Sequence, residues 1–335
     1  MFRVALDLLG GDHVPSGPAE GARAALEAGP SDLSLLLVGP GSYRHRMLRR
    51  LPADRVKWID AEERIDPADP PARAVRNQPN STIARGLDAV RSGEADAFVS
   101  AGSTGAIMAA SVIKLGVLPG IKRPPVGAMF PTMTGRTLVL DVGAHVPHKR
   151  ERHRRERFLQ LAHLGKLYLK SQWTEPGSPR RRPRVGLLNI GEESRAGGPL
   201  HKIHELLTRD SLIRFVGNVE GNEIVNGKCD VLLCDGFVGN ILLKFYESAF
   251  GFLEQQLRSE GLKYELPKRV GEIMDYTTYG GVPLLGVNGV SVVCHGASPP
   301  RAIGNGIAAA HRCCRGGMVR RMRKGLLRLS SKVRS

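Results

Sequence analysis

Short apolar runs alternate with helix-length segments along almost the whole of this 335-residue sequence. The apolar runs, many of them rich in β-branched residues, are Phe2–Leu8, Leu33–Val38, Val56–Ile59, Ala97–Ser100, Thr137–Asp141, Val185–Asn189, Ile213–Val216, Val231–Cys234 and Val290–Cys294. Helical patterns between them include Ala19–Ala28, Thr82–Arg91, Thr104–Leu115 and Arg154–Leu169. This alternation predicts an α/β fold in which helices cover both faces of a largely parallel sheet.

Glycine and polar residues follow the apolar runs directly. Six such segments are Asp7–His13, Ser100–Gly105, Leu140–His145, Leu188–Glu193, Phe215–Gly221 and Cys234–Asn240. Open α/β sheets bind ligands at the carboxyl ends of their strands, where helix N-termini direct N–H groups toward anions. One glycine-rich loop is typical of an ordinary turn. Six together predict a crevice of backbone donors, carboxylates and amides, suited to a small anion and a polarised carbonyl.

None of these loops has the glycine pattern of a dinucleotide or nucleoside triphosphate site. The nearest, Val38–Gly41, lacks a third glycine, so a nicotinamide or ATP enzyme is disfavoured. Five cysteines without repeated CxxC spacing also disfavour a zinc site or a disulfide framework. Cys229, Cys234 and Cys294 are expected in the core. We therefore expect neither a metal nor a cofactor.

The formal net charge is +17 and is unevenly placed. Residues 312–335 hold nine Arg and Lys and no acidic residue, and two further basic clusters are residues 148–157 and 180–184. Such charge favours an acidic partner (nucleic acid, an anionic membrane or an acidic protein), although a solubilising surface is an equal alternative. No apolar run approaches the roughly 18 residues of a membrane span, and no secretory h-region is visible, so we expect a cytoplasmic location.

Several long motifs carry a resemblance. They are Ala5–Pro15, SAGSTGAIMA, Gly120–Pro124, LDVGAH, VGLLNIGEE, FVGNVEGNE, CDGFVGNILLK and GGVPLLGVNGVSVVCHGAS, ending at Ser298. In this order they resemble the PlsX family of phosphate acyltransferases. The resemblance implies a three-layer α/β/α sandwich with a Rossmann-like sheet, related to phosphotransacetylases. It also implies one domain over residues 1–311, a basic tail over residues 312–335, and a homodimer.

The same resemblance implies transfer of a fatty acyl group from acyl-acyl-carrier-protein to inorganic phosphate, giving acyl-phosphate for phospholipid synthesis. We expect the phosphate in a cradle formed by Gly102, Ser103, Thr104 and Gly105, with added charge from Lys122 or Arg123. Catalytic candidates, which could equally cap loops, are Asp7, Asp12, Asp141, Asp235 and His295. Further binding candidates are Gly143, His145, Asn189, Glu192, Asn218, Gly236 and Asn240. No cysteine lies where a covalent intermediate would need one.

Ser103 and His145 stand where the family pattern has asparagine, which leaves acyl specificity open. The alternative enzyme is a phosphotransacetylase-like protein that uses acyl-CoA or a dedicated carrier. A nucleic-acid-binding protein is disfavoured, because aromatic residues form only 5% of the chain and the basic runs lack interleaved stacking residues. The acidic acyl carrier protein is the expected partner of the basic clusters.

Two helical patterns lie near the end of the chain. Residues Phe237–Leu257 have an apolar face that is typical of core burial, whereas exposed aromatics there would indicate a docking surface. In the tail, Met318, Met322, Leu326 and Leu329 share one face among many arginines. Such a helix suits an anionic membrane interface, close to a membrane acyltransferase, although the glycines of the tail equally favour disorder.

Overall fold

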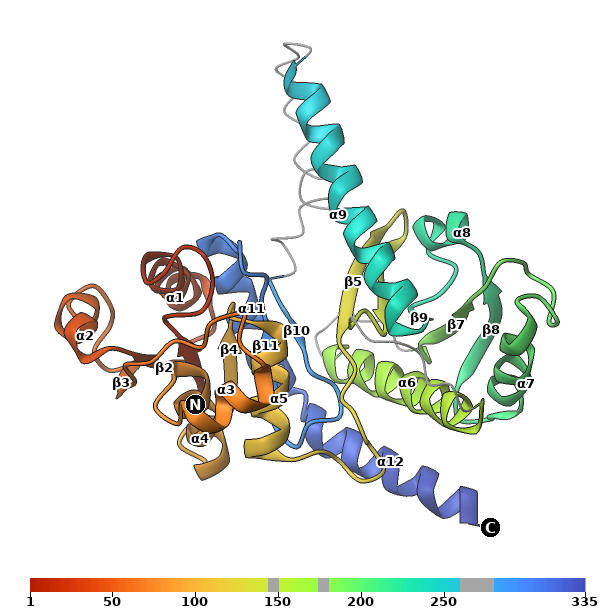
Figure 1. Ribbon diagram of the computed structural model, residues 1–335, viewed down its shortest axis with the longest axis horizontal. Coiled ribbons are helices and arrows are strands. Elements are labelled where there is room, and N and C mark those ends of the chain that lie inside the picture. Colours follow the sequence, from red (N-terminus) through yellow and green to blue (C-terminus); the bar gives the residue numbers. More distant parts are fainter. Residues whose placement is uncertain (144–150, 174–180, 260–279, 335) are drawn as a thin grey trace. The chain divides into compact units, whose positions relative to one another are not determined.

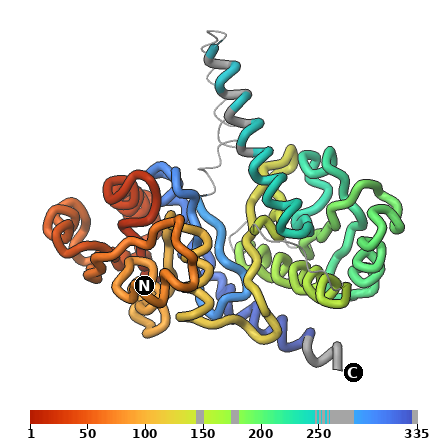
Figure 2. Tube along the Cα trace, viewed as in Figure 1, coloured from red at the N-terminus to blue at the C-terminus, as the bar shows by residue number. Residues whose placement is uncertain are grey.

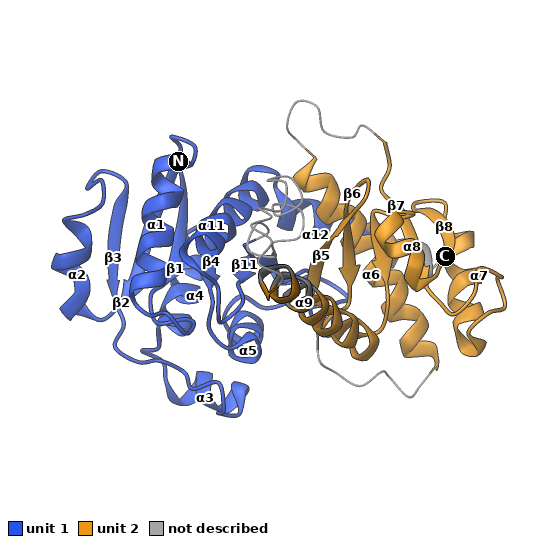
Figure 3. Cartoon of the chain, turned by 90° about the horizontal axis from the view of Figure 1, so that it is seen from above, with its two compact units in different colours: residues 1–124, 277–327 blue, residues 125–276, 328–335 orange. Residues whose placement is uncertain are grey.

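The computed structural model describes residues 1–143, 151–173, 181–259 and 280–334, in two compact units. Unit 1 contains residues 1–124 and 277–327, and unit 2 contains residues 125–276 and 328–335 (Figure 3). Each unit has its own largely parallel sheet with helices against it, which confirms the predicted α/β fold. The predicted single domain is not tested by this division, because two compact units can still fold together.

Unit 1 is built around a six-stranded sheet with the order β10-β11-β4-β1-β2-β3. Its elements are β1 (Phe2–Asp7), α1 (Ser16–Ala28), β2 (Leu33–Gly39), α2 (Gly41–Leu48), β3 (Val56–Asp60), α3 (Pro71–Asn77), α4 (Thr82–Ser92), β4 (Ala97–Ser100), α5 (Thr104–Leu115), β10 (Val282–Pro283), β11 (Val290–Val293), α11 (Pro300–Arg315) and the larger part of α12 (Met318–Arg334), whose residues from 328 onward belong to unit 2. Only β10 is antiparallel to its neighbour. The chain runs outward from β1 to β3 and then returns to β4, so right-handed crossovers place α1 and α4 on opposite faces.

The end of the described chain returns to the first strand. In Figure 2 the late α11 segment lies beside the early α1 segment, and α11 packs against α1, β1 and β4. His311 of α11 is buried, and its Nε2 lies 2.9 Å from Oδ1 of Asp32, before β2. Residues about 280 positions apart in sequence thus complete one core in unit 1.

Unit 2 is built around a five-stranded sheet with the order β5-β6-β9-β7-β8. Its elements are β5 (Gly127–Thr132), β6 (Gly135–Leu140), α6 (Glu151–Gln172), β7 (Arg184–Leu188), a 3₁₀ turn (Gly198–Leu200), α7 (His201–Arg209), β8 (Arg214–Val219), α8 (Gly221–Asn226), β9 (Val231–Leu233) and α9 (Gly236–Ser259) (Figure 1). Strands β6, β9, β7 and β8 run parallel, while β5 is antiparallel to β6.

All nine predicted strands overlap observed ones, and two strands were missed. Strand β5 contains a glycine and Pro131, which weaken the pattern of a strand. Strand β10 has only two residues. Neither leaves a periodic signal in the sequence.

Helices α9 and α12 differ in how far their apolar side chains are exposed. On α12, Met318, Met322 and Leu326 are at most 3% exposed, so the apolar face predicted for a membrane is already covered. On α9, Phe237 and Phe245 are 56% and 71% exposed, so the prediction of burial is wrong for them. No helix among the described residues is long and apolar enough to cross a membrane.

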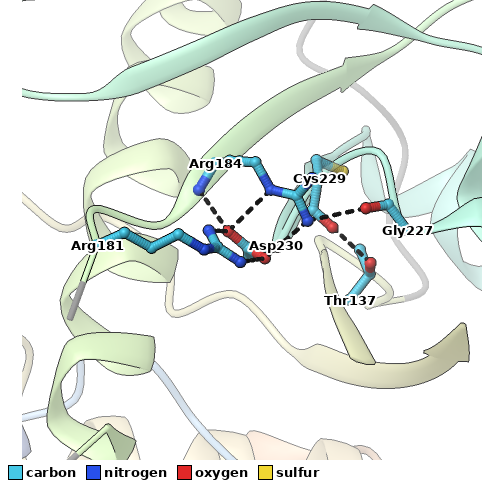
Figure 4. Close-up of polar contacts among 6 residues, drawn as sticks. All are labelled: Thr137, Arg181, Arg184, Gly227, Cys229 and Asp230. Atoms are coloured by element: carbon cyan, nitrogen blue, oxygen red, sulfur yellow. Dashed lines mark hydrogen bonds and ion pairs between the residues drawn. The ribbon is translucent and has the colours of Figure 1, made fainter. Parts of the chain in front are cut away.

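Asp230 is a buried residue directly before β9, and it bonds to the start of β7 (Figure 4) and to the middle of β6. The N–H of Asp230 donates to the carbonyl of Arg184 on β7, and its own carbonyl accepts from Leu138 on β6. Its side chain accepts hydrogen bonds from Arg181 and from the backbone and side chain of Arg184. Burial alone would raise the pKa of Asp230, but these bonds outweigh it and lower the pKa to about 2.

We predict that Asp230→Asn destabilises the fold by about 2 kcal/mol at pH 7, since the folded carboxyl has a pKa near 2 and the free one 3.8. A lowered folded pKa adds stability that is present above the unfolded pKa and lost as pH falls toward 2. The difference between the two proteins should therefore hold from pH 7 to pH 5 and shrink below pH 4. Urea unfolding across this range measures it, and equal stabilities at pH 7 would contradict the assignment.

Candidate active site

Three neighbouring strands of unit 1 bring their carboxyl ends together. Strands β11, β4 and β1 are adjacent and parallel, with Val293 opposite Ser100 and Val99 opposite Leu6. The loops that follow them contain the cradle residues, two aspartates and His295. Two of the six predicted loop segments, residues 7–13 and 100–105, therefore lie at one edge of the sheet of unit 1, together with the loop after β11. The other four belong to unit 2, so one crevice lined by all six stays a prediction.

A buried hydrogen-bonded cluster lies at the centre of this edge. The Ser100 hydroxyl donates to Oδ2 of Asp7 at 2.6 Å and accepts from the N–H of Gly102 at 2.9 Å. Oδ1 of Asp7 accepts from the N–H of Leu9 at 2.9 Å. Burial raises the pKa of Asp7, and hydrogen bonds, chiefly from Ser100 and then Thr82, oppose the increase. Asp7 is 1% exposed, and its carboxylate oxygens bond to Leu9 and Ser100, so a catalytic role for it stays a prediction.

Glycine is required where these loops meet. A Cβ on Gly10 would lie 2.7 Å from Oδ2 of Asp7, 2.7 Å from the nitrogen of Gly102 and 2.8 Å from the hydroxyl of Ser100. Gly11 has a φ of +101°, and a Cβ there would lie 2.8 Å from the carbonyl of Gly296. The loops after β1, β4 and β11 therefore approach more closely than side chains would allow.

The cradle residues form the N-terminus of α5. Ser103 is the N-cap, and its hydroxyl accepts from the N–H of Ala106 at 3.4 Å. Thr104 and Gly105 follow as the first helical residues, and both are exposed. The helix thus presents exposed backbone donors and one hydroxyl at the positively polarised end of its dipole. Serine in place of the family's asparagine keeps the cap.

Asp12 and His295 belong to neighbouring loops. The N–H of Asp12 donates to the carbonyl of Gly296 at 2.9 Å. Nδ1 of His295 accepts from the N–H of Ala297 at 3.2 Å, so the neutral ring carries its proton on Nε2. Asp12 and His295 are both exposed at this edge of the sheet, so proton transfer by either residue stays a prediction.

Unit 2 repeats the arrangement at the ends of β6 and β9. Asp141 is 2% exposed, and its Oδ1 accepts from the N–H groups of Val126 and Gly143, each at 3.0 Å. Its Oδ2 accepts from Arg157 at 2.7 Å. Asp235 accepts from the N–H of Val238 at 3.0 Å in the first turn of α9. Both aspartates thus hold backbone in place.

The side-chain amides of Asn189 and Asn218, at the ends of β7 and β8, also form hydrogen bonds within the protein. Asn189 bonds to the carbonyl of Ala196 and the N–H of Ile190, while Asn218 bonds to the carbonyl of Glu193 and to Nδ1 of His204. Glu192 forms an exposed ion pair with Lys228 at 2.8 Å. Gly236 and Asn240 lie in the first turns of α9. Ligand binding by these five residues stays a prediction.

The remaining predicted residues lie elsewhere. Lys122 and Arg123 are exposed near the end of the first segment of unit 1, and their role as partners of an anion stays a prediction. His145 lies outside the described residues.

Three residues that bond to the predicted site loops were not predicted from the sequence. Ser100 ends an apolar strand, and its position beside the cradle was the available signal. Arg157 was assigned to a surface cluster, yet its side chain is 12% exposed and pairs with Asp141. Arg64 donates to the carbonyl of Gly11 at 2.9 Å, and nothing in its sequence neighbourhood indicates this contact.

Comparison with known proteins decides the family. Residues 2–321 match the family described as "Fatty acid synthesis protein". A phosphate acyltransferase of Halothermothrix orenii is 41% identical, covering 92% of this chain and 94% of the relative. One of Salinibacter ruber is 42% identical, covering 92% and 93%. The chain belongs to this family. The resemblance to PlsX proteins is confirmed, and the chain is an enzyme of the phosphate acyltransferase class.

Solved structures agree on the fold of this phosphate acyltransferase. The EutD phosphotransacetylase of Staphylococcus aureus has a TM-score of 0.56 at 16% identity, covering 93% of this chain and 94% of that one. A phosphotransacetylase of Streptococcus pyogenes has a TM-score of 0.54 at 16% identity, covering 93% and 94%. The predicted structural relation to phosphotransacetylases is confirmed.

We predict that Gly10→Ala lowers both stability and activity of the acyltransferase, because the new Cβ meets backbone and buried polar atoms that cannot move apart. Overpacking of this kind costs about 1–3 kcal/mol. Gly221→Ala is the matched control, since a Cβ there has nothing within 4 Å. Thermal unfolding and acyl-phosphate formation measure both effects. A Gly10→Ala protein as stable and active as the control would show that the close packing of the loops is dispensable.

Proposed function

We propose that this phosphate acyltransferase transfers a fatty acyl group from acyl-acyl-carrier-protein to inorganic phosphate, and that the acyl-phosphate feeds phospholipid synthesis. The observation that carries the proposal is the exposed N-terminus of α5 beside the Asp7–Ser100 cluster. It offers N–H groups and the Thr104 hydroxyl to a small anion, at residues that are exposed although Pro71 lies close to Gly105. The names of the curated relatives agree with phosphate as the acyl acceptor.

In the proposed reaction, a phosphate oxygen attacks the thioester carbonyl and forms a tetrahedral oxyanion. The C–S bond then breaks, leaving acyl-phosphate and a carrier thiolate that takes up a proton. Phosphate is already a fair nucleophile at neutral pH, so the protein acts by holding it in line and by stabilising the oxyanion. Cysteine does not participate, since burial raises the pKa of Cys294 to about 12 and that of Cys234 well above its usual value.

His295 is the proposed donor of the proton to the leaving thiol. Nδ1 accepts from the N–H of Ala297, so the donated proton would come from Nε2. The aspartates are occupied elsewhere: Asp7 is buried, Asp141 pairs with Arg157, and Asp235 bonds to the first turn of α9. We propose positioning roles for these three.

A homodimer and a peripheral position at the inner face of the membrane remain proposals. The exposed basic residues of α12 support membrane contact. The buried methionines of the same helix do not support it, so any such contact would be electrostatic.

The choice of acyl donor tests the proposal directly. Purified protein incubated with phosphate and either acyl-acyl-carrier-protein or acyl-CoA of the same chain length should form acyl-phosphate faster from the carrier thioester. Trapping the product with hydroxylamine measures both rates. Product from acyl-CoA alone would instead assign a phosphotransacetylase-like activity.

We predict that Thr104→Val raises the KM for phosphate with little change in stability, since valine keeps the shape and removes the hydroxyl. An unsatisfied polar contact costs about 1–3 kcal/mol, which corresponds to a roughly five- to 100-fold higher KM. Thr208→Val, at an exposed position on α7, is the control. An unchanged KM for phosphate in Thr104→Val would remove α5 from the phosphate site.

A further inference from the structure

Helix α2 and the two residues after it form a basic surface that the sequence analysis did not single out. Residues 41–50 contain Arg44, Arg46, Arg49 and Arg50 and no acidic residue. All four arginines are exposed, and within the described chain none is paired with a carboxylate. Arg46 lies over the ring of Tyr43, with 5.7 Å between the guanidinium carbon and the ring centroid.

Two of the three basic clusters in the sequence, residues 148–157 and 180–184, are different, because part of their charge is paired within unit 2. Arg157 pairs with Asp141, Arg181 and Arg184 pair with Asp230, and Arg152 pairs with Glu156. A paired arginine contributes little attraction at a distance, whereas four unpaired ones within seven residues create a strong local field. The α2 surface is therefore one concentration of unpaired charge in unit 1, and the exposed basic residues among 320–324 of α12 are another. The α2 surface is the one that directly follows β2, the neighbour of β1.

This surface lies beside the cradle loops. Strand β2 pairs with β1 so that Val38 is opposite Asp7, and the N–H of Leu8 donates to the carbonyl of Val38 at 3.0 Å. Helix α2 begins two residues after β2 ends. Neighbouring strands are about 4.8 Å apart, and an eight-residue helix is about 12 Å long. The arginines thus lie within roughly 20 Å of the loop that contains Gly10.

The shape of the surface suits a folded partner. One hollow of about 420 Å³ is lined by Gly41, Arg44, His45, Leu48 and Arg49. A second, of about 280 Å³, lies between α1 and α2, with Met47 and Leu51 among its lining. Arg46 and Arg50 lie around it, together with Glu20 and with Arg23, which pairs with Glu27. No large apolar side chain of residues 41–51 is fully exposed, so the surface lacks what a helix inserts into lipid.

We infer that α2 with Arg49 and Arg50 is the docking surface for the acidic face of the acyl carrier protein. The inference rests on the proposed function, because only a carrier-linked substrate needs a protein docking surface. The acyl group is tethered to its carrier, so the carrier must dock close to the site of transfer. Acidic side chains on a carrier helix would pair with the arginines, while its apolar residues would enter the hollows.

The test is the double variant Arg44→Glu/Arg49→Glu. We expect its KM for acyl-acyl-carrier-protein to rise about tenfold or more, because reversed charges repel the carrier. Turnover of an acyl-pantetheine thioester, which has no acidic protein attached, should stay unchanged, as should the KM for phosphate. Arg209→Glu/Arg214→Glu, two exposed arginines of unit 2, is the matched control and should leave both donors unaffected.

Salt supplies a second readout. Between about 0.05 and 0.5 M salt, the KM of the wild-type protein for the carrier thioester should rise, since the screening length falls below ~10 Å. The double variant should lose most of this dependence. If it keeps the wild-type KM and salt dependence, the inference is wrong. A loss of sedimentation with anionic phosphatidylglycerol vesicles, with the carrier KM unchanged, would overturn it in favour of lipid. Absence of acyl-phosphate from carrier thioesters in the wild-type protein would refute the proposed function itself.

Discussion

The hydrogen bond between Ser100 and the buried carboxylate of Asp7 fixes the geometry on which the site depends. It joins the carboxyl ends of β1 and β4, and the same hydroxyl receives the N–H of Gly102, so the start of the cradle is tied to both strands. Closing the loops to this distance leaves no room for a side chain on Gly10. Thr104 and Gly105, the first residues of α5, remain exposed beside this packed contact. The proposed phosphate site thus lies next to loops that one buried hydrogen bond holds together.

In unit 2, the buried aspartate that follows a strand pairs with an arginine in place of hydroxyl groups. Asp141 also ends a buried strand and also accepts two backbone N–H groups, but it pairs with Arg157, whereas Asp7 has hydroxyl partners. Burial without a cation raises the pKa of Asp7, so its ionised form is the more costly of its two states in the folded protein. Aspartate after an apolar strand therefore indicates a loop that is held in place. It does not by itself indicate an acid catalyst.

The positions of most strands could be predicted from the sequence, because apolar β-branched runs bounded by glycine seldom form another kind of secondary structure. The sequence was also sufficient for the grouping of the loops in unit 1, since parallel strands place their carboxyl ends at one edge. It did not reveal that the chain builds two sheets, because strand order is set by pairing between residues far apart in sequence. The burial of Met318 and Met322 was equally hidden. An amphipathic helix has the same pattern whether protein or lipid covers its apolar face.

Net charge was the least informative sequence feature for the same reason. A formal charge of +17 counts Arg157, Arg181 and Arg184 as equal to Arg44 and Arg49, although the first three are bound to buried aspartates and the last two are not. An arginine bound to a buried carboxylate stabilises the fold, and its field is largely cancelled beyond that contact. Only the unpaired arginines can attract an acidic molecule in solution. The attraction of this enzyme for an acidic partner should therefore follow the position of its unpaired arginines and not their total number. In the described part of unit 1, such arginines lie on α2 and on α12.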